Sequence, residues 1–115
     1  VDPFAHYVAV TTDKGEVVLH NLQTKENKTL GKDLQPCTAI TFSETGLYMA
    51  SGYENGQVKM WDVQSGNLIG TLSGHKARIN DIKFGKNDKL LATASFDKSV
   101  RVWDLDQLNE LPLVL

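Results

Sequence analysis

Apolar and polar residues alternate along several short stretches of the chain. VKMWDV (58–63) and VRVWDL (100–105) each carry an alternating run into Trp-Asp. A period of two places alternate side chains on opposite faces of a β-strand. TAITFS (38–43), LYMASGY (47–53) and NLIGTL (67–72) are further short runs, rich in β-branched and aromatic residues and bounded by turn residues. Because helical spacing is absent, we predict an all-β fold with antiparallel strands.

Two of the turns between these runs carry local signals of their own. Asn55-Gly56 predicts a tight hairpin with a primed-type turn, because both residues tolerate a positive φ. The equivalent Asp97-Lys98 lacks the glycine. We expect Asp97 to hold that turn through side-chain hydrogen bonds to nearby backbone amides.

The strand runs recur with a fixed period. Trp103 lies 42 residues after Trp61, and the same offset pairs Phe42 with Phe84. Four antiparallel strands over such a period are typical of one blade of a propeller.

A degenerate third copy opens the chain. An offset of 41 residues carries YMA (48–50) onto YVA (7–9). His20-Asn21 then stands where Trp-Asp is expected.

Gly74-His75, TASFD (93–97) and VRVWDL together resemble one complete WD repeat. The middle copy is similar but lacks Gly-His. The chain as a whole resembles the WD-repeat (WD40) β-propeller family, which implies antiparallel four-stranded blades, here about 2.7 of them in 115 residues. We expect a partial degenerate blade at 1–31, a WD repeat with an incomplete hydrogen-bond network at 32–74, and a full WD repeat plus the outer strand of the last blade at 75–115.

The resemblance also implies a buried hydrogen-bond network that locks the strands of a blade together. Its members in this sequence are His75, Thr93, Asp97 and Trp103. Histidine, hydroxyl and carboxylate are the groups of a catalytic triad too, but a triad is recognised by geometry and not by composition. We therefore interpret these four residues as structural and predict no catalytic residues.

The other two copies depart from this pattern. Ser51 and Trp61 remain in the middle copy, whereas Asn55 replaces the Asp. We expect an incomplete network there, and hence a smaller loss of stability for Trp61→Phe than for Trp103→Phe. The first copy carries Val10, Lys14 and His20 at the matching places.

Charge and cysteine content narrow the function classes. Twelve Lys and Arg residues against fourteen Asp and Glu give a formal net charge of −2, which offers no general electrostatic reason to bind nucleic acid. A single cysteine, Cys37, makes neither an intramolecular disulfide nor a cysteine-based zinc site. The opening residues have the pattern of neither a signal peptide nor a natural start, so we interpret the chain as an excerpt. We predict an intracellular protein, cytoplasmic or nuclear, with no metal, cofactor or membrane contact.

In the family, partners bind on the face that carries the turn after the second strand and the start of the first. The matching residues here are Arg78, Asn80 and Phe96 in the last repeat and Pro36, Thr38 and Glu54 in the middle one. An aromatic beside an arginine is the composition that interface hot spots favour. The alternative is that Phe96 packs against a neighbouring blade.

These features predict a noncatalytic scaffold for protein or peptide partners, as part of a larger propeller or multidomain protein. The alternative is the propeller portion of an enzyme or a signalling ATPase whose active site lies outside this segment. Propellers close with about four to eight blades. A shorter array leaves apolar end faces exposed, and we expect these to associate with further blades or with another copy.

Overall fold

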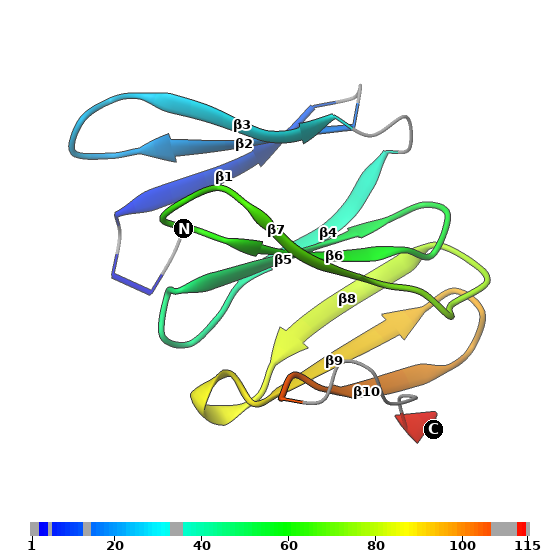
Figure 1. Ribbon diagram of the computed structural model, residues 1–115. Coiled ribbons are helices and arrows are strands. Elements are labelled where there is room, and N and C mark those ends of the chain that lie inside the picture. The colour runs from blue at the N-terminus through cyan, green and yellow to red at the C-terminus, as the bar shows by residue number, and fades with distance from the viewer. Residues whose placement is uncertain (1–2, 5, 13–14, 33–35, 107–112, 115) are drawn as a thin grey trace.

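The computed structural model folds into three antiparallel β-sheets that lie side by side in chain order (Figure 1). It describes residues 3–4, 6–12, 15–32, 36–106 and 113–114. Within these ranges the helical structure is one 3₁₀ turn, η1 (Lys86–Asp88). The prediction of an all-β fold built from propeller blades is confirmed.

Each sheet is a meander of neighbouring strands. The first has the order β1 (Tyr7–Thr11), β2 (Glu16–Asn21), β3 (Asn27–Lys32); the second β4 (Cys37–Phe42), β5 (Tyr48–Tyr53), β6 (Val58–Asp62), β7 (Leu68–Leu72); the third β8 (Ile79–Phe84), β9 (Leu90–Ser95), β10 (Val100–Asp104), β11 (Leu113–Val114). In a sequence alignment of the repeats, the 41-residue offset matches β1, β2 and β3 of the first sheet with β5, β6 and β7 of the second. The first sheet therefore presents the second, third and fourth strands of a blade.

The predicted primed-type turn at Asn55-Gly56 is wrong. The Gly56 amide donates to the Tyr53 carbonyl over 3.1 Å, and the Tyr53 amide donates to the Gln57 carbonyl over 2.9 Å. Gly56 has a φ of +91°, whereas Asn55 is not among the positive-φ residues. Such a three-residue loop needs only its last residue in the left-handed region, so the second positive φ of a primed turn is unnecessary.

The third sheet repeats this turn without a glycine. Lys98 takes the left-handed position with a φ of +72°, and its amide donates to the Ser95 carbonyl over 3.2 Å. Asp97 Oδ1 accepts a hydrogen bond of 2.9 Å from the Ser99 amide. Asp97 thus holds the turn through a backbone amide, as its position in the sequence predicted.

Two apolar clusters fill the spaces between the sheets. Val17 and Leu19 of β2 pack with Met49, Trp61 and Val63 of the second sheet. On the opposite side of the second sheet the cluster consists of Ala50, Val58, Met60 and Leu72 with Ile79, Ile82, Leu91 and Trp103 of the third. Neighbouring residues along β5 and β6 thus enter different clusters, because strand side chains alternate between faces.

The outward face of the third sheet carries apolar residues, like the face of the second sheet that packs on the third. Among the described residues no further sheet packs on it. Val100 corresponds to Val58 in the repeat; Val58 is 0% exposed and Val100 is 37% exposed. At the other end of the array, Val10 of β1 is 51% exposed. Positions that are buried in the middle sheet are therefore accessible at the two ends.

Candidate functional site

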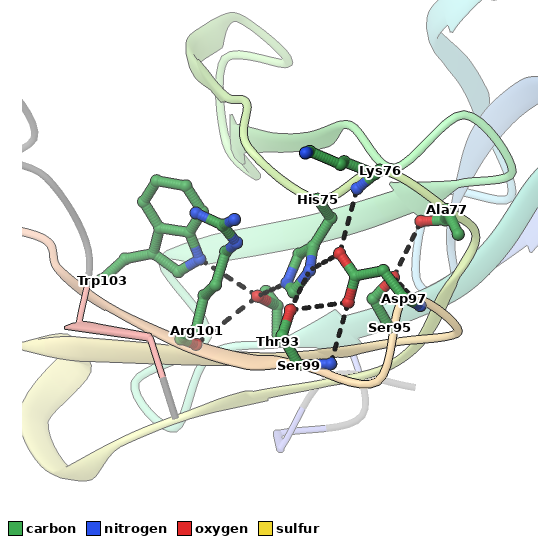
Figure 2. Close-up of polar contacts among 9 residues, drawn as sticks. All are labelled: His75, Lys76, Ala77, Thr93, Ser95, Asp97, Ser99, Arg101 and Trp103. Carbon is green, nitrogen blue, oxygen red and sulfur yellow. Dashed lines mark hydrogen bonds and ion pairs between the residues drawn. The ribbon is translucent and has the colours of Figure 1, made fainter.

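The third sheet brings together all four residues that the family resemblance implied for its network (Figure 2). Trp103 Nε1 of β10 donates to Thr93 Oγ1 of β9 over 3.1 Å. Thr93 Oγ1 lies 2.7 Å from His75 Nε2, and His75 Nδ1 lies 3.0 Å from Asp97 Oδ2. A continuous polar chain therefore links the third strand, the second strand, the loop before the first strand and the turn at Asp97.

The partners of His75 assign its tautomer. With its hydrogen on Nδ1, the ring donates to the Asp97 carboxylate and accepts the Thr93 hydroxyl hydrogen at Nε2. Thr93 Oγ1 can then accept the Trp103 N–H, so that every member has a partner. Buried polar groups are tolerated when they are paired in this way.

The Asp97 carboxylate is held by four donors. The Lys76 amide reaches Oδ2 over 3.0 Å, and the amide and hydroxyl of Ser99 reach Oδ1 over 2.9 and 2.6 Å. His75 is the fourth donor. Burial raises the pKa of Asp97, but the hydrogen bonds from Ser99, Lys76 and His75 lower it by more, so this pKa lies well below its ordinary value. The carboxylate is therefore ionised at neutral pH.

The burial of the cluster bears on its chemistry. Thr93 is 0% exposed and its hydroxyl lies between the Trp103 indole and the His75 ring. A nucleophile has to approach a reacting atom of the substrate to about 3–3.5 Å. In this arrangement the Thr93 hydroxyl contacts the Trp103 indole of β10 and the His75 ring of the loop before β8.

The middle sheet has a shorter network with a member that sequence reasoning missed. Trp61 Nε1 donates to Ser51 Oγ over 2.9 Å, and Ser51 Oγ donates to the Tyr53 hydroxyl over 3.0 Å. Asn55 does not join; its Oδ1 accepts from the Gln57 amide over 3.1 Å. The sequence could have indicated Tyr53 as a member, because the period of two in a strand places it on the same face as Ser51. The network lacks imidazole and carboxylate, but Tyr53 completes it with a hydroxyl.

In the first sheet His20 takes the position of the tryptophan. Its Nδ1 lies 2.6 Å from Asn27 Oδ1 on β3. The exposed Val10 supplies no polar group at the position of Ser51, and Lys14 lies outside the described residues.

The residue after the tryptophan position has one role in all three sheets. Asn21 Oδ1 accepts from the Thr24 amide over 3.1 Å, Asp62 Oδ1 from the Ser65 amide over 3.1 Å, and Asp104 Oδ1 from the Asp106 amide over 3.0 Å. These contacts stabilise the turn after the third strand, since Asn and Asp side chains readily bond amides two or three residues on. Asn21 thus makes the contact of the Asp of the pair in the sheet that has no tryptophan.

The predicted partner surface of the third sheet centres on Phe96. Phe96 is 63% exposed, and Arg78 Cζ lies 5.0 Å from the centre of its ring. The Phe96 amide donates to the Arg78 carbonyl over 2.8 Å. Within the described residues Phe96 is thus a surface residue, and Asn80 is exposed in the irregular part of β8.

The matching residues of the middle sheet lie in the same arrangement. The Glu54 amide donates to the Pro36 carbonyl over 3.0 Å, and both residues are exposed. Thr38 differs, because its hydroxyl donates to the Ile79 carbonyl of the third sheet over 2.6 Å. Its hydroxyl therefore ties two sheets together.

The part of the chain with described structure shows neither a cluster of metal ligands nor a helix that could span a membrane. No group of three or more His, Cys, Asp or Glu residues there is placed to hold a metal ion. None of its helical structure is long and apolar enough to cross a membrane.

The chain matches a known family along most of its length. A family model described as the Vps8 beta-propeller matches residues 3–111. Eukaryotic translation initiation factor 3 subunit I of Nematostella vectensis is 34% identical over 83 residues, which cover 72% of this chain and 26% of that protein. WD repeat and SOCS box-containing protein 1 of Homo sapiens is 39% identical over 75 residues, which cover 64% of this chain and 18% of that protein. The chain thus spans about a quarter or less of these curated relatives.

Solved structures share the fold at lower sequence identity. The structure of U3-55K superposes with a TM-score of 0.89 at 19% identity, covering 100% of this chain and 37% of that one. A chain of the mitotic checkpoint complex gives a TM-score of 0.85 at 23% identity, covering 95% of this chain and 33% of that one. Together with the repeated strands, the Trp-Asp pairs and the family model, these matches show that the chain belongs to the WD40 β-propeller family, within the group that the Vps8 β-propeller model describes.

Proposed function

We propose that this chain is part of a noncatalytic WD-repeat scaffold that works inside the cell and binds protein partners on the turn surface around Phe96. The observation that carries the proposal is the exposed Phe96 ring with the Arg78 guanidinium over it. Exposed aromatic and arginine side chains supply a large share of binding energy at protein interfaces. The backbone hydrogen bond between the two residues fixes the chain segments that carry the pair, and a preorganised surface lowers the entropy cost of binding.

The polar cluster behind this surface serves the fold in this proposal. His75, Thr93 and Trp103 are buried and satisfy one another's hydrogen bonds. The Asp97 carboxylate fixes the turn that carries Phe96, through the amides of Lys76 and Ser99. The network thus supports recognition by positioning Phe96 and not by contact with a partner.

We also propose that residues 1–31, 32–74 and 75–115 are successive blades of a larger propeller. The exposure of Val100, where the equivalent Val58 is fully buried, supports a further blade on the third sheet. The exposed Val10 supports the same at the first sheet.

The proposal is tested with the double substitution Arg78→Ala and Phe96→Ala in the protein that carries this chain. The matched control is Lys86→Ala with Leu90→Ala, which also removes one cation and one exposed apolar side chain, at the opposite end of the same sheet. Co-purifying proteins are quantified by mass spectrometry, and thermal unfolding is recorded for each variant. We expect partners to be lost only with the Arg78/Phe96 variant, at an unchanged melting temperature. Retention of all partners, or a lowered melting temperature, would overturn the proposal.

A further inference from the structure

We infer that the partner segment bound at Phe96 is an extended acidic peptide. This inference rests on the proposed function and names the chemistry of the partner. It comes from the charges that surround the exposed ring.

Three cationic residues flank Phe96. Lys76 and Lys98 adjoin Asp97, the first through its amide hydrogen bond to Oδ2 and the second as the next residue in the chain. Arg78 lies over the Phe96 ring itself. All three cationic residues are exposed. A ligand that covers the Phe96 ring therefore meets the Arg78 guanidinium, and two further exposed lysines lie in the adjoining chain segments.

The one acidic group within this cluster offers little to a ligand. The oxygens of Asp97 accept hydrogen bonds from Lys76, Ser99 and His75, and its side chain is 14% exposed. Its remaining capacity to bind a donor of the partner is small. The carboxylate is thus directed into the network while the cations face solvent.

Arg78 is suited to a carboxylate partner. The planar guanidinium of arginine presents N–H donors that match a carboxylate in a bidentate manner. Phe96 lies beside Arg78. Its ring offers apolar contact to the methylene groups of the partner's acidic residue or to the next residue of the partner. The pair therefore fits a segment in which acidic and apolar residues lie close together.

The neighbouring sheet limits the length of this surface. Glu54 occupies the position in the second sheet that Phe96 occupies in the third, and it is exposed. A like charge disfavours continuation of an acidic segment in that direction. We therefore expect recognition by one short segment across the third sheet.

Single-stranded nucleic acid is the rival occupant, since aromatic and basic side chains also bind stacked bases and phosphates. The exposed cations here, however, are only three residues gathered around one aromatic ring. Proteins that bind along the phosphate backbone of a single strand use an extended, positively charged groove. The observations favour carboxylates, and RNA becomes an outcome of the test.

The experiment measures fluorescence anisotropy with the full chain and three labelled probes. These are a short peptide of alternating glutamate and leucine, the same peptide with glutamine for glutamate, and oligouridylate. We expect the glutamate peptide to bind at least about tenfold more tightly than the glutamine peptide at low salt, with the preference shrinking as salt rises.

Substitutions locate the binding. Arg78→Ala and Phe96→Ala are each expected to weaken glutamate-peptide binding about tenfold. Lys76→Gln and Lys98→Gln are each expected to weaken it about two- to fivefold, the range of exposed ion pairs. Arg78→Lys keeps the charge but loses the planar fork, so it should fall between wild type and Arg78→Ala. The control Lys86→Gln with Lys89→Gln, at the opposite end of the sheet, should have no effect.

Each other outcome overturns the inference. Equal binding of the two peptides, no binding of either, tighter binding of oligouridylate, or an equal loss with the Lys86/Lys89 control would all do so. The proposed function is judged separately: if Arg78→Ala with Phe96→Ala still removes cellular partners while the peptides show no charge preference, scaffold binding stands and the acidic partner falls.

Discussion

Trp61 donates its indole hydrogen bond to Ser51 Oγ over 2.9 Å, although the other partner of this serine is not a histidine. The Ser51 hydroxyl finds its own acceptor in Tyr53, which is buried. The pairing of tryptophan and hydroxyl across neighbouring strands is thus maintained in the second sheet by a different third member. A buried hydroxyl needs a partner, but the partner need not be an imidazole.

This pairing changes the expected cost of removing either indole. Trp61→Phe and Trp103→Phe should lower the free energy of unfolding by similar amounts, about 1–3 kcal/mol each, because each removes one buried donor and leaves the hydroxyl at least one other partner. Urea unfolding of both variants measures the difference. A loss at Trp103 that exceeds that at Trp61 by more than about 1.4 kcal/mol, a factor of ten in the equilibrium constant, would restore the contrast predicted from the sequence.

Tyr53→Phe tests the substitute member directly. The change removes the acceptor of the Ser51 hydroxyl while keeping the ring in the core. We expect a loss of about 1 kcal/mol in the free energy of unfolding. Tyr48→Phe makes the same chemical change at a partly buried position outside the network. Equal losses of unfolding free energy in the two variants would show that the hydrogen bond between Ser51 and Tyr53 does not stabilise the fold.

Asp97 makes part of the stability depend on pH. Its pKa is lowered in the folded protein, so the stabilisation by its carboxylate is fully present above the unfolded pKa of about 3.9 and is lost as the pH falls through the folded value. Asp97→Asn should therefore be less stable than wild type at neutral pH, with a difference that shrinks as the pH falls below about 4. Urea midpoints across this range measure the effect.

The control for that experiment is Asp106→Asn, which neutralises an exposed carboxylate in the turn after β10. It should leave the pH dependence of the midpoint close to that of wild type. A constant difference between Asp97→Asn and wild type at all pH values would contradict the role given to the Asp97 carboxylate.

Gly56 is required for two reasons. Its φ is +91°, and a Cβ there would lie 2.4 Å from the His75 carbonyl oxygen at the entry to the third sheet. Gly46→Ala shares only the backbone cost, about 1–2 kcal/mol for a left-handed residue, since its φ is +77° in the turn at the other end of the sheet. Gly56→Ala should cost more than Gly46→Ala in urea unfolding. The contact with His75 would be unimportant if the two losses were equal.

The strands and the stacking of the sheets could be predicted because they follow from two regularities of the sequence, the period of two within a strand and the repeat of about 42 residues. Alternation along VKMWDV and VRVWDL defines two faces per strand, and the repeat offset places equivalent residues in equivalent sheets. The Trp-Asp pair was similarly informative, since Asp104 bonds a backbone amide only two residues away. Local hydrogen bonds of this kind follow from residue type and spacing.

What could not be predicted depends on how side chains meet in three dimensions. The turn at Asn55-Gly56 has two solutions with similar residue preferences, and the sequence does not choose between them. Thr38 looked like a free surface residue, but its hydroxyl bonds the Ile79 carbonyl of the next sheet. That contact depends on the spacing between sheets, which no pattern along one strand contains.

The free energy of unfolding of Thr93→Val tests most directly whether the polar cluster of the third sheet serves the fold. Valine keeps the shape of threonine but removes the atom that bonds both Trp103 and His75. We predict a loss of about 1–3 kcal/mol for each buried group left without a partner. An unchanged free energy of unfolding in urea would contradict the claim and would reopen the question of what this buried hydroxyl does.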